Sequence, residues 1–239
     1  MPLSQTAPLA AHQQHRHFGI SSLSLSGDAA RLYSVCKDNT VYAYSTNHLV
    51  LGQAPQLASP GMARHGAGEQ GLGPLYGIRH PSFHTSTFYV RSAIRTAAAD
   101  RCELLALGSS DACAVLLPTD ERALRASTLR QQNQQQNHQQ QRRQQQPQQP
   151  QPAAPAIPLY EVGTPLVRGH SKEVTSVGWT ADGALVSIGD DYTARCWRED
   201  AAEARDLRVG GEGQGRRHRC GWADVPAPWD DDGDDDEGD

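Results

Sequence analysis

Apolar and polar residues alternate along three short stretches in the C-terminal third of the chain. The stretches are 174–179, 184–188 and 193–197, and each has the alternation typical of a half-buried strand. The segments 181–183 and 189–191 separate them with glycine and aspartate, residues that favour tight turns. This pattern predicts three consecutive β-strands.

Four polar or aromatic residues stand at fixed places around these strands. His170 follows Gly169, Ser187 lies in the second stretch, Asp191 in the turn and Trp197 six residues later. This is the sequence form of one Trp-Asp (WD) repeat, a four-stranded blade of a β-propeller. By resemblance to such blades, these four side chains form a buried hydrogen-bonded chain. A catalytic His170–Asp191 dyad is the alternative, but it explains only two of the four positions.

Two weaker copies of this spacing lie upstream. Asp38 is followed six residues later by Tyr44, and Asp111 six residues later by Leu117, so both keep an aromatic or apolar residue where Trp197 stands. His84 is the candidate for the Gly-His position of the second copy. The strands expected in the first copy are 19–25 and 32–36, and those expected in the second are 87–92 and 104–107.

The intervals between the turn aspartates indicate insertions. Asp38 and Asp111 are 73 positions apart, and Asp111 and Asp191 are 80 apart, whereas a WD repeat has about 40–45 residues. The segment 51–75 is rich in Gly and Pro and is expected to be a loop insertion. The segment 126–157 contains 14 Gln among residues 131–151, and we expect it to be disordered because it lacks apolar side chains for a core. A lineage-specific loop expansion is favoured over an assembly segment.

The fold class expected is therefore all-β, a partial WD-repeat propeller of about three blades. The expected blades are 18–50, 76–125 and 158–200, preceded by a flexible N-terminus at 1–17 and followed by a disordered tail at 201–239. Since propellers close with about four to eight blades, we expect further blades from a longer form of this protein or from another chain. An open array would otherwise expose a strand edge.

Charge, cysteine content and hydropathy argue against metal sites, a disulfide framework and a membrane span. The net charge of −5 arises from an acidic end, since residues 230–239 hold eight acidic groups; we favour a solubilising role for them over docking of a basic partner. Five scattered cysteines without CxxC pairs indicate neither zinc nor a disulfide framework, and Cys36, Cys113 and Cys196 are expected to be buried thiols. We expect no metal site from His12, His15 and His17, no cofactor, no signal peptide and no membrane span.

Several short sequence segments add a resemblance to a known family. Three of them, at 86–92, 107–111 and 169–177, occur in this order, and the segments at 19–23, 37–42 and 221–223 support them. Together they resemble the last blades of the denticleless protein family, which supplies the substrate receptor of a cullin-4 RING ubiquitin ligase. The resemblance covers 18–125 and 158–200, and 201–223 loosely. The phrase at 169–177 alone also fits unrelated WD proteins.

The resemblance implies a non-catalytic nuclear adaptor that directs replication and cell-cycle proteins to ubiquitin-dependent degradation. Its partners would be the ligase's adaptor propeller with cullin-4 and protein substrates, without membrane or direct nucleic-acid binding; the basic cluster at 216–219 is too short to argue otherwise. One departure is clear. Receptors of this class carry Trp-Asp-x-Arg at a blade end. This chain has no such motif; the nearest is Trp197-Arg198, with Arg where Asp should be. The family's C-terminal clamp-binding segment is not recognisable.

Partner-binding residues are therefore only weakly indicated. Arg198 is a candidate for the adaptor, and Tyr89 and Arg91 are candidates for a surface position, although ordinary strand packing explains them better. The rival functions are a generic WD scaffold of another nuclear complex, an enzyme such as a propeller hydrolase, and a product that does not fold.

Overall fold

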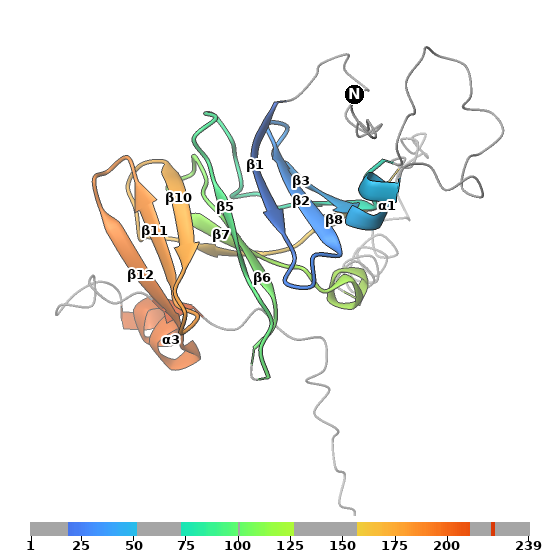
Figure 1. The fold of residues 1–239 in the computed structure, drawn as a ribbon. Helices are drawn as coiled ribbons and strands as arrows, with labels where there is room; N and C mark the ends of the chain where they lie inside the picture. Colours follow the sequence, from blue (N-terminus) through green and yellow to red (C-terminus); the bar gives the residue numbers. More distant parts are fainter. Residues whose placement is uncertain (1–18, 52–72, 100, 127–156, 211–220, 223–239) are drawn as a thin grey trace, which may run out of the picture.

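Three β-sheets stand side by side in the computed structural model (Figure 1). The structure describes residues 19–51, 73–99, 101–126, 157–210 and 221–222. The first sheet, in spatial order, consists of β1 (Ile20–Leu25), β2 (Arg31–Cys36), β3 (Thr40–Ser45), β4 (Tyr76–Arg79) and β8 (Leu159–Glu161). The second consists of β5 (Ser92–Arg95), β6 (Leu104–Leu107), β7 (Ala114–Pro118) and β9 (Thr164–Leu166). The third consists of β10 (Val174–Trp179), β11 (Leu185–Gly189), β12 (Ala194–Glu199) and β13 (Gly221–Trp222).

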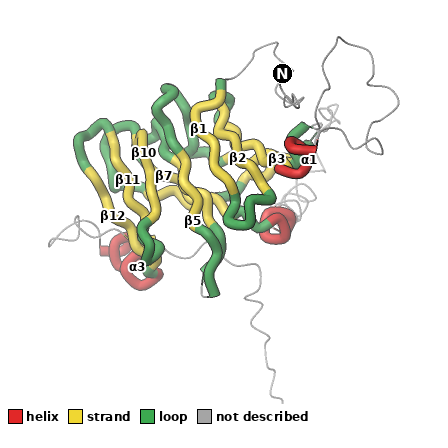
Figure 2. The backbone as a smooth tube through the Cα atoms, in the orientation of Figure 1, coloured by secondary structure: helices red, strands yellow, loops and turns green. Residues whose placement is uncertain are grey.

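Helices are few, as the strand pattern predicted. α1 (Thr46–Leu51) follows β3 directly, a short helix begins at residue 121, and α3 (Ala201–Gly210) follows β12. In the tube view these helices lie at the margins of the sheets (Figure 2). No helix in the described part of the chain is long and apolar enough to cross a membrane. The prediction of an all-β partial propeller is confirmed.

The sheets pack face to face through two apolar layers. Tyr33, Val35 and Val41 of the first sheet meet Leu105, Leu107 and Leu117 of the second. Ala106, Ala114 and Leu116 on the opposite side of the second sheet meet Val174, Leu185 and Trp197 of the third. The second sheet is thus covered on both sides, and burial on both sides explains why Leu104–Leu107 is an unbroken apolar run.

The innermost strands also contact one another. The guanidinium of Arg91 donates to the Ser21 carbonyl at 2.5 Å, and the indole N–H of Trp179 donates to the Ala93 carbonyl at 3.1 Å. These bonds join β1 to the start of β5 and β5 to β10, so the sheets are fixed along their inner edge as well as through their faces.

The sheets do not coincide with the expected blades. β4 and β9 lie near the start of a repeat in sequence, yet each pairs with the third strand of the preceding sheet. The segment 87–92, expected to be a strand, is mostly loop, and the strand begins only at Ser92. The physical reason is that the Thr87 side chain accepts the Tyr89 N–H at 3.2 Å, a local bond that competes with strand pairing.

Two further expectations need correction. Part of the segment expected as a disordered tail is ordered, because α3 leads to β13, where Trp222 is 2% exposed and packs edge-on against Trp179. Cys196 is exposed, whereas Cys36 and Cys113 are buried. Cys196 lies on the face of the third sheet that no other described sheet covers. The expected N-terminal region 1–17, the core of both insertions, the basic cluster and the acidic end lie outside the described residues.

Candidate partner-binding face

One end of the three sheets carries the turns in which the three aspartates lie. This end, called the loop face below, consists of the turns 37–39, 108–113 and 190–193 and the connections 80–91 and 167–173. The residue after each aspartate has the same left-handed backbone, with φ of 60° at Asn39, 58° at Ala112 and 60° at Tyr192. The aspartate turn is therefore repeated in all three sheets.

The third sheet joins its four singled-out residues into one chain of hydrogen bonds. The Trp197 indole N–H donates to Ser187 Oγ at 2.8 Å, and Ser187 Oγ lies 2.8 Å from His170 Nε2. His170 Nδ1 lies 3.2 Å from both Asp191 oxygens. One tautomer satisfies every group: Nδ1–H donates to Asp191, and Nε2 accepts the Ser187 hydroxyl proton.

Asp191 is the anionic end of this chain. Burial by itself raises the pKa of the Asp191 carboxyl, but the Ser171 amide, the Thr193 hydroxyl and His170 together lower it by more, so that the pKa falls well below 3.8. The amide and hydroxyl bonds measure 2.9 and 2.8 Å. An ionised, fully hydrogen-bonded carboxylate of this kind stabilises the turn and the imidazole.

Gly169 is required beside this chain by close packing. A Cβ at this position would lie 2.2 Å from Cζ2 of Trp197, closer than any real contact. The two residues of the Gly-His pair thus have separate roles: the glycine leaves space for the Trp197 indole, and the histidine links Ser187 to Asp191 by hydrogen bonds.

The second sheet keeps only part of this arrangement. His84 Nδ1 lies 2.8 Å from Asp111 Oδ2, with both side chains nearly half exposed. Leu117 is fully buried in the apolar layer, where no polar partner is needed. His84 and Asp111 therefore form an isolated surface pair.

In the first sheet, the hydroxyl of Tyr42 donates to Asp38 Oδ2 at 2.6 Å. The phenol that meets Asp38 thus belongs to Tyr42, which the sequence reasoning missed, and not to Tyr44. Tyr44 packs with Cys36 and Tyr42 in a small buried cluster. The alternation of residues along β3 could have indicated this contact, because Tyr42 and Tyr44 lie on the same side of the strand and Tyr42 is the nearer of the two to the Asp38 turn.

Two aromatic side chains project from the centre of the loop face. Phe88 is 55% exposed and Tyr89 is 69% exposed, yet their loop is held from both sides. Lys37 of the first sheet donates to the Ser86 carbonyl at 2.9 Å, with its ammonium 4.3 Å from the Phe88 ring centre. On the other side, Thr87 donates to Glu173 at 2.9 Å.

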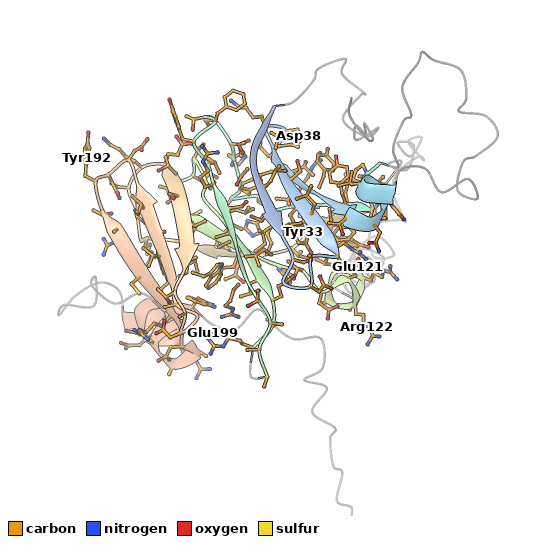
Figure 3. All side chains as sticks on the ribbon, viewed as in Figure 1. Tyr33, Asp38, Glu121, Arg122, Tyr192 and Glu199 are labelled. Atoms are coloured by element: carbon orange, nitrogen blue, oxygen red, sulfur yellow. The ribbon has the colours of Figure 1, made fainter. Side chains whose placement is uncertain are left out.

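The other weakly indicated residues have different surroundings. The Arg91 amide donates to the Thr175 carbonyl and its guanidinium to Ser21, so Arg91 joins three sheets. Arg198 is exposed and forms a 3.3 Å ion pair with Asp182, away from the loop face. Tyr192, 96% exposed, is a further loop-face aromatic that the sequence reasoning missed (Figure 3).

The opposite end carries a cleft of about 970 Å³ between the first two sheets, near Tyr33, Glu121 and Arg122 (Figure 3). The charged side chains of this cleft bond mainly to other groups of the same chain. Arg31 pairs with Glu121 at 2.8 Å, and Glu103 accepts hydrogen bonds from the Gly27 amide and the Thr119 hydroxyl. In the described part of the chain, no group of three or more His, Cys, Asp or Glu side chains is arranged to hold a metal ion.

Comparison with known proteins agrees with this geometry. Residues 162–198 match the family model "WD domain, G-beta repeat". The chain is also similar to "Cell division cycle protein cdt2" of Schizosaccharomyces pombe, with 24% identity over 212 residues. That match covers 87% of this chain but 30% of the relative, so the chain spans less than a third of the relative's length. The chain thus contains a WD repeat at 162–198 and resembles cdt2 over most of its length.

Proposed function

We propose that this chain is a non-catalytic scaffold that presents protein substrates to a cullin-4 RING ubiquitin ligase in the nucleus. The observation that carries the proposal is the Phe88–Tyr89 loop, which is exposed and yet fixed between two neighbouring sheets. Exposed aromatic side chains in a fixed geometry are the usual anchors of a protein interface, since little conformational freedom is lost on binding.

Two lines of support connect this loop face to substrate presentation. The similarity to cdt2 and the WD repeat favour a receptor of the denticleless kind. The His170–Asp191 pair is committed to the Ser187–Trp197 chain, which favours a structural role over a catalytic dyad. Transfer of ubiquitin would then depend on a raised effective concentration near the charged conjugating enzyme. Replication and cell-cycle proteins are the proposed substrates.

A reconstituted ubiquitination assay tests the proposal. Cullin-4, its RING subunit and its adaptor propeller are combined with a replication-licensing factor, with and without this chain. We expect the chain to bind the adaptor complex and to raise substrate ubiquitination. The Phe88→Ala/Tyr89→Ala variant should lose at least about tenfold of this gain if both rings are anchors. Val209→Ala, which shortens an 83% exposed side chain on α3, is the matched control and should behave as the parent.

The alternative is a generic WD scaffold of another nuclear complex, favoured by the absence of Trp-Asp-x-Arg from the sequence. If the chain binds neither the adaptor complex nor the substrate, the receptor function is wrong and this alternative takes its place. If it binds the adaptor complex but the aromatic variant works normally, the loop face is not where substrate binds.

A further inference from the structure

Lysine is almost absent from this chain. The sequence contains 22 Lys and Arg residues together, and Lys37 and Lys172 are the only lysines among them. The two kinds of cation differ in their chemistry. The guanidinium of arginine stays protonated in proteins, whereas the ε-amine of lysine can lose its proton and act as a nucleophile. The side chains of this sequence therefore offer two amines for an acyl-transfer reaction.

Both lysines lie on the loop face, but they differ in how open their amines are. The ammonium of Lys37 donates to the Ser86 carbonyl at 2.9 Å and lies 4.3 Å from the centre of the Phe88 ring, which covers it on one side. Lys172 is exposed. Among the described residues, none forms a hydrogen bond or an ion pair with the Lys172 ammonium, and the centre of the Tyr192 ring lies 5.9 Å from it. Lys172 is thus the accessible amine.

The backbone on both sides of Lys172 is fixed. The Ser171 amide donates to Asp191 at 2.9 Å, and the Glu173 carboxylate accepts the Thr87 hydroxyl proton at 2.9 Å. The Lys172 side chain therefore starts from a rigid point, and its long stem leaves the amine free to turn toward an approaching reactant.

Lys172 also lies beside the proposed substrate anchors. Thr87, which bonds to the neighbouring Glu173, directly precedes Phe88 and Tyr89 in their loop. A substrate held on these two rings would cover Lys172 and would offer its own lysines to the ligase. The Lys172 amine is therefore open only while the loop face is empty.

We propose that Lys172 accepts ubiquitin when no substrate occupies the loop face, so that an empty receptor is itself ubiquitinated. This inference rests on the proposed function, because the ubiquitin thioester is supplied by a conjugating enzyme that the ligase brings close. The deprotonated ε-amine attacks the thioester carbonyl, and a C–N bond replaces the C–S bond. The conjugating enzyme leaves as a thiol, which takes up the proton that the amine loses.

The cullin-4 ligase reconstituted with the full chain, but without substrate, tests the proposal. After reaction with ubiquitin, trypsin leaves a Gly-Gly remnant on each modified amine, and mass spectrometry locates it. We expect the remnant on Lys172, and neither on Lys37 nor on the α-amine of Met1. A saturating amount of a replication-licensing factor should strongly reduce the remnant, because the bound substrate covers the loop face.

Two variants separate the amine from its surroundings. Lys172→Arg keeps the positive charge but removes the nucleophile, so self-ubiquitination should be lost. Adding Arg168→Lys to this variant returns an amine to the same connection, at a position that is also exposed. The remnant should then return, now at position 168.

Three outcomes would overturn the proposal. A remnant on Lys37 or Met1 with none on Lys172 would place the acceptor elsewhere. A Lys172 remnant that saturating substrate does not reduce would mean that this amine lies outside the substrate surface. Failure of the double variant to regain the remnant would mean that Lys172→Arg acts through something other than loss of the amine.

Failure of this inference can be distinguished from failure of the proposed function. If the chain binds the adaptor complex and raises substrate ubiquitination but carries no remnant on Lys172, the proposed function stands and the inference is wrong. If the chain neither binds the adaptor complex nor raises substrate ubiquitination, both are wrong.

Discussion

Removing the hydroxyl of Ser187 should destabilise the third sheet by an amount set by two hydrogen bonds. Ser187 is completely buried, and its oxygen lies 2.8 Å from both Trp197 Nε1 and His170 Nε2. In Ser187→Ala, the indole N–H and the imidazole nitrogen both lose their partner in a site closed to water. An unsatisfied buried group costs about 1–3 kcal/mol, so the loss should be about 2–5 kcal/mol in total.

Urea unfolding followed by tryptophan fluorescence measures this loss. With a slope of about 2 kcal/mol per molar urea, the midpoint should fall by about 1–2.5 M. Ser176→Ala, a hydroxyl deletion on the uncovered side of the same sheet, is the matched control and should change stability by less than about 0.5 kcal/mol. A Ser187→Ala loss no larger than that of the control would refute the reasoning, because the chain would then contribute nothing to stability.

The remaining predictions concern packing, acid stability and thiol reactivity. Gly169→Ala places a Cβ against the Trp197 ring and should cost about 1–3 kcal/mol; an unchanged melting temperature would show that the indole can move. Because the folded pKa of Asp191 lies below 3.8, its stabilisation is fully present above that pH and is lost as the pH falls through the folded value. Between pH 5 and 2, about the range in which carboxylates titrate, stability should therefore fall less steeply in Asp191→Asn than in the parent, and equal slopes would contradict this. Maleimide at neutral pH should modify exposed Cys196 and Cys102 quickly, whereas burial, which raises the thiol pKa of Cys36 and of Cys113 to about 11, should protect these two; mass mapping decides, and rapid labelling of Cys36 would contradict it.

The loop of Phe88 and Tyr89 is the place where we propose that other proteins bind. The loop face presents side chains whose positions are set by Lys37 and Glu173 from the flanking sheets.

The sequence by itself determined the strands and turns of the third sheet. Alternation along 174–179 and 184–188 depends on neighbouring residues only, and the spacing from Gly169 through Trp197 is that of a repeated local unit. The same reasoning located the aspartate turns at Asp38 and Asp111, where the structure repeats the left-handed residue. It also gave the all-β class, since patterns of period two recur along the chain.

Only the tertiary structure decided which strands complete which sheet and which side chains meet across the gaps between them. β9 joins the second sheet, Trp222 returns to the third, and Glu173 holds the loop of Phe88 and Tyr89. Likewise, the tertiary structure leaves Cys196 exposed and places Tyr42 beside Asp38. The physical reason is that a strand's own pattern states which face is apolar but not which edge or sheet will cover it. That choice depends on contacts between residues far apart in the chain, whose closure entropy and packing no local pattern records.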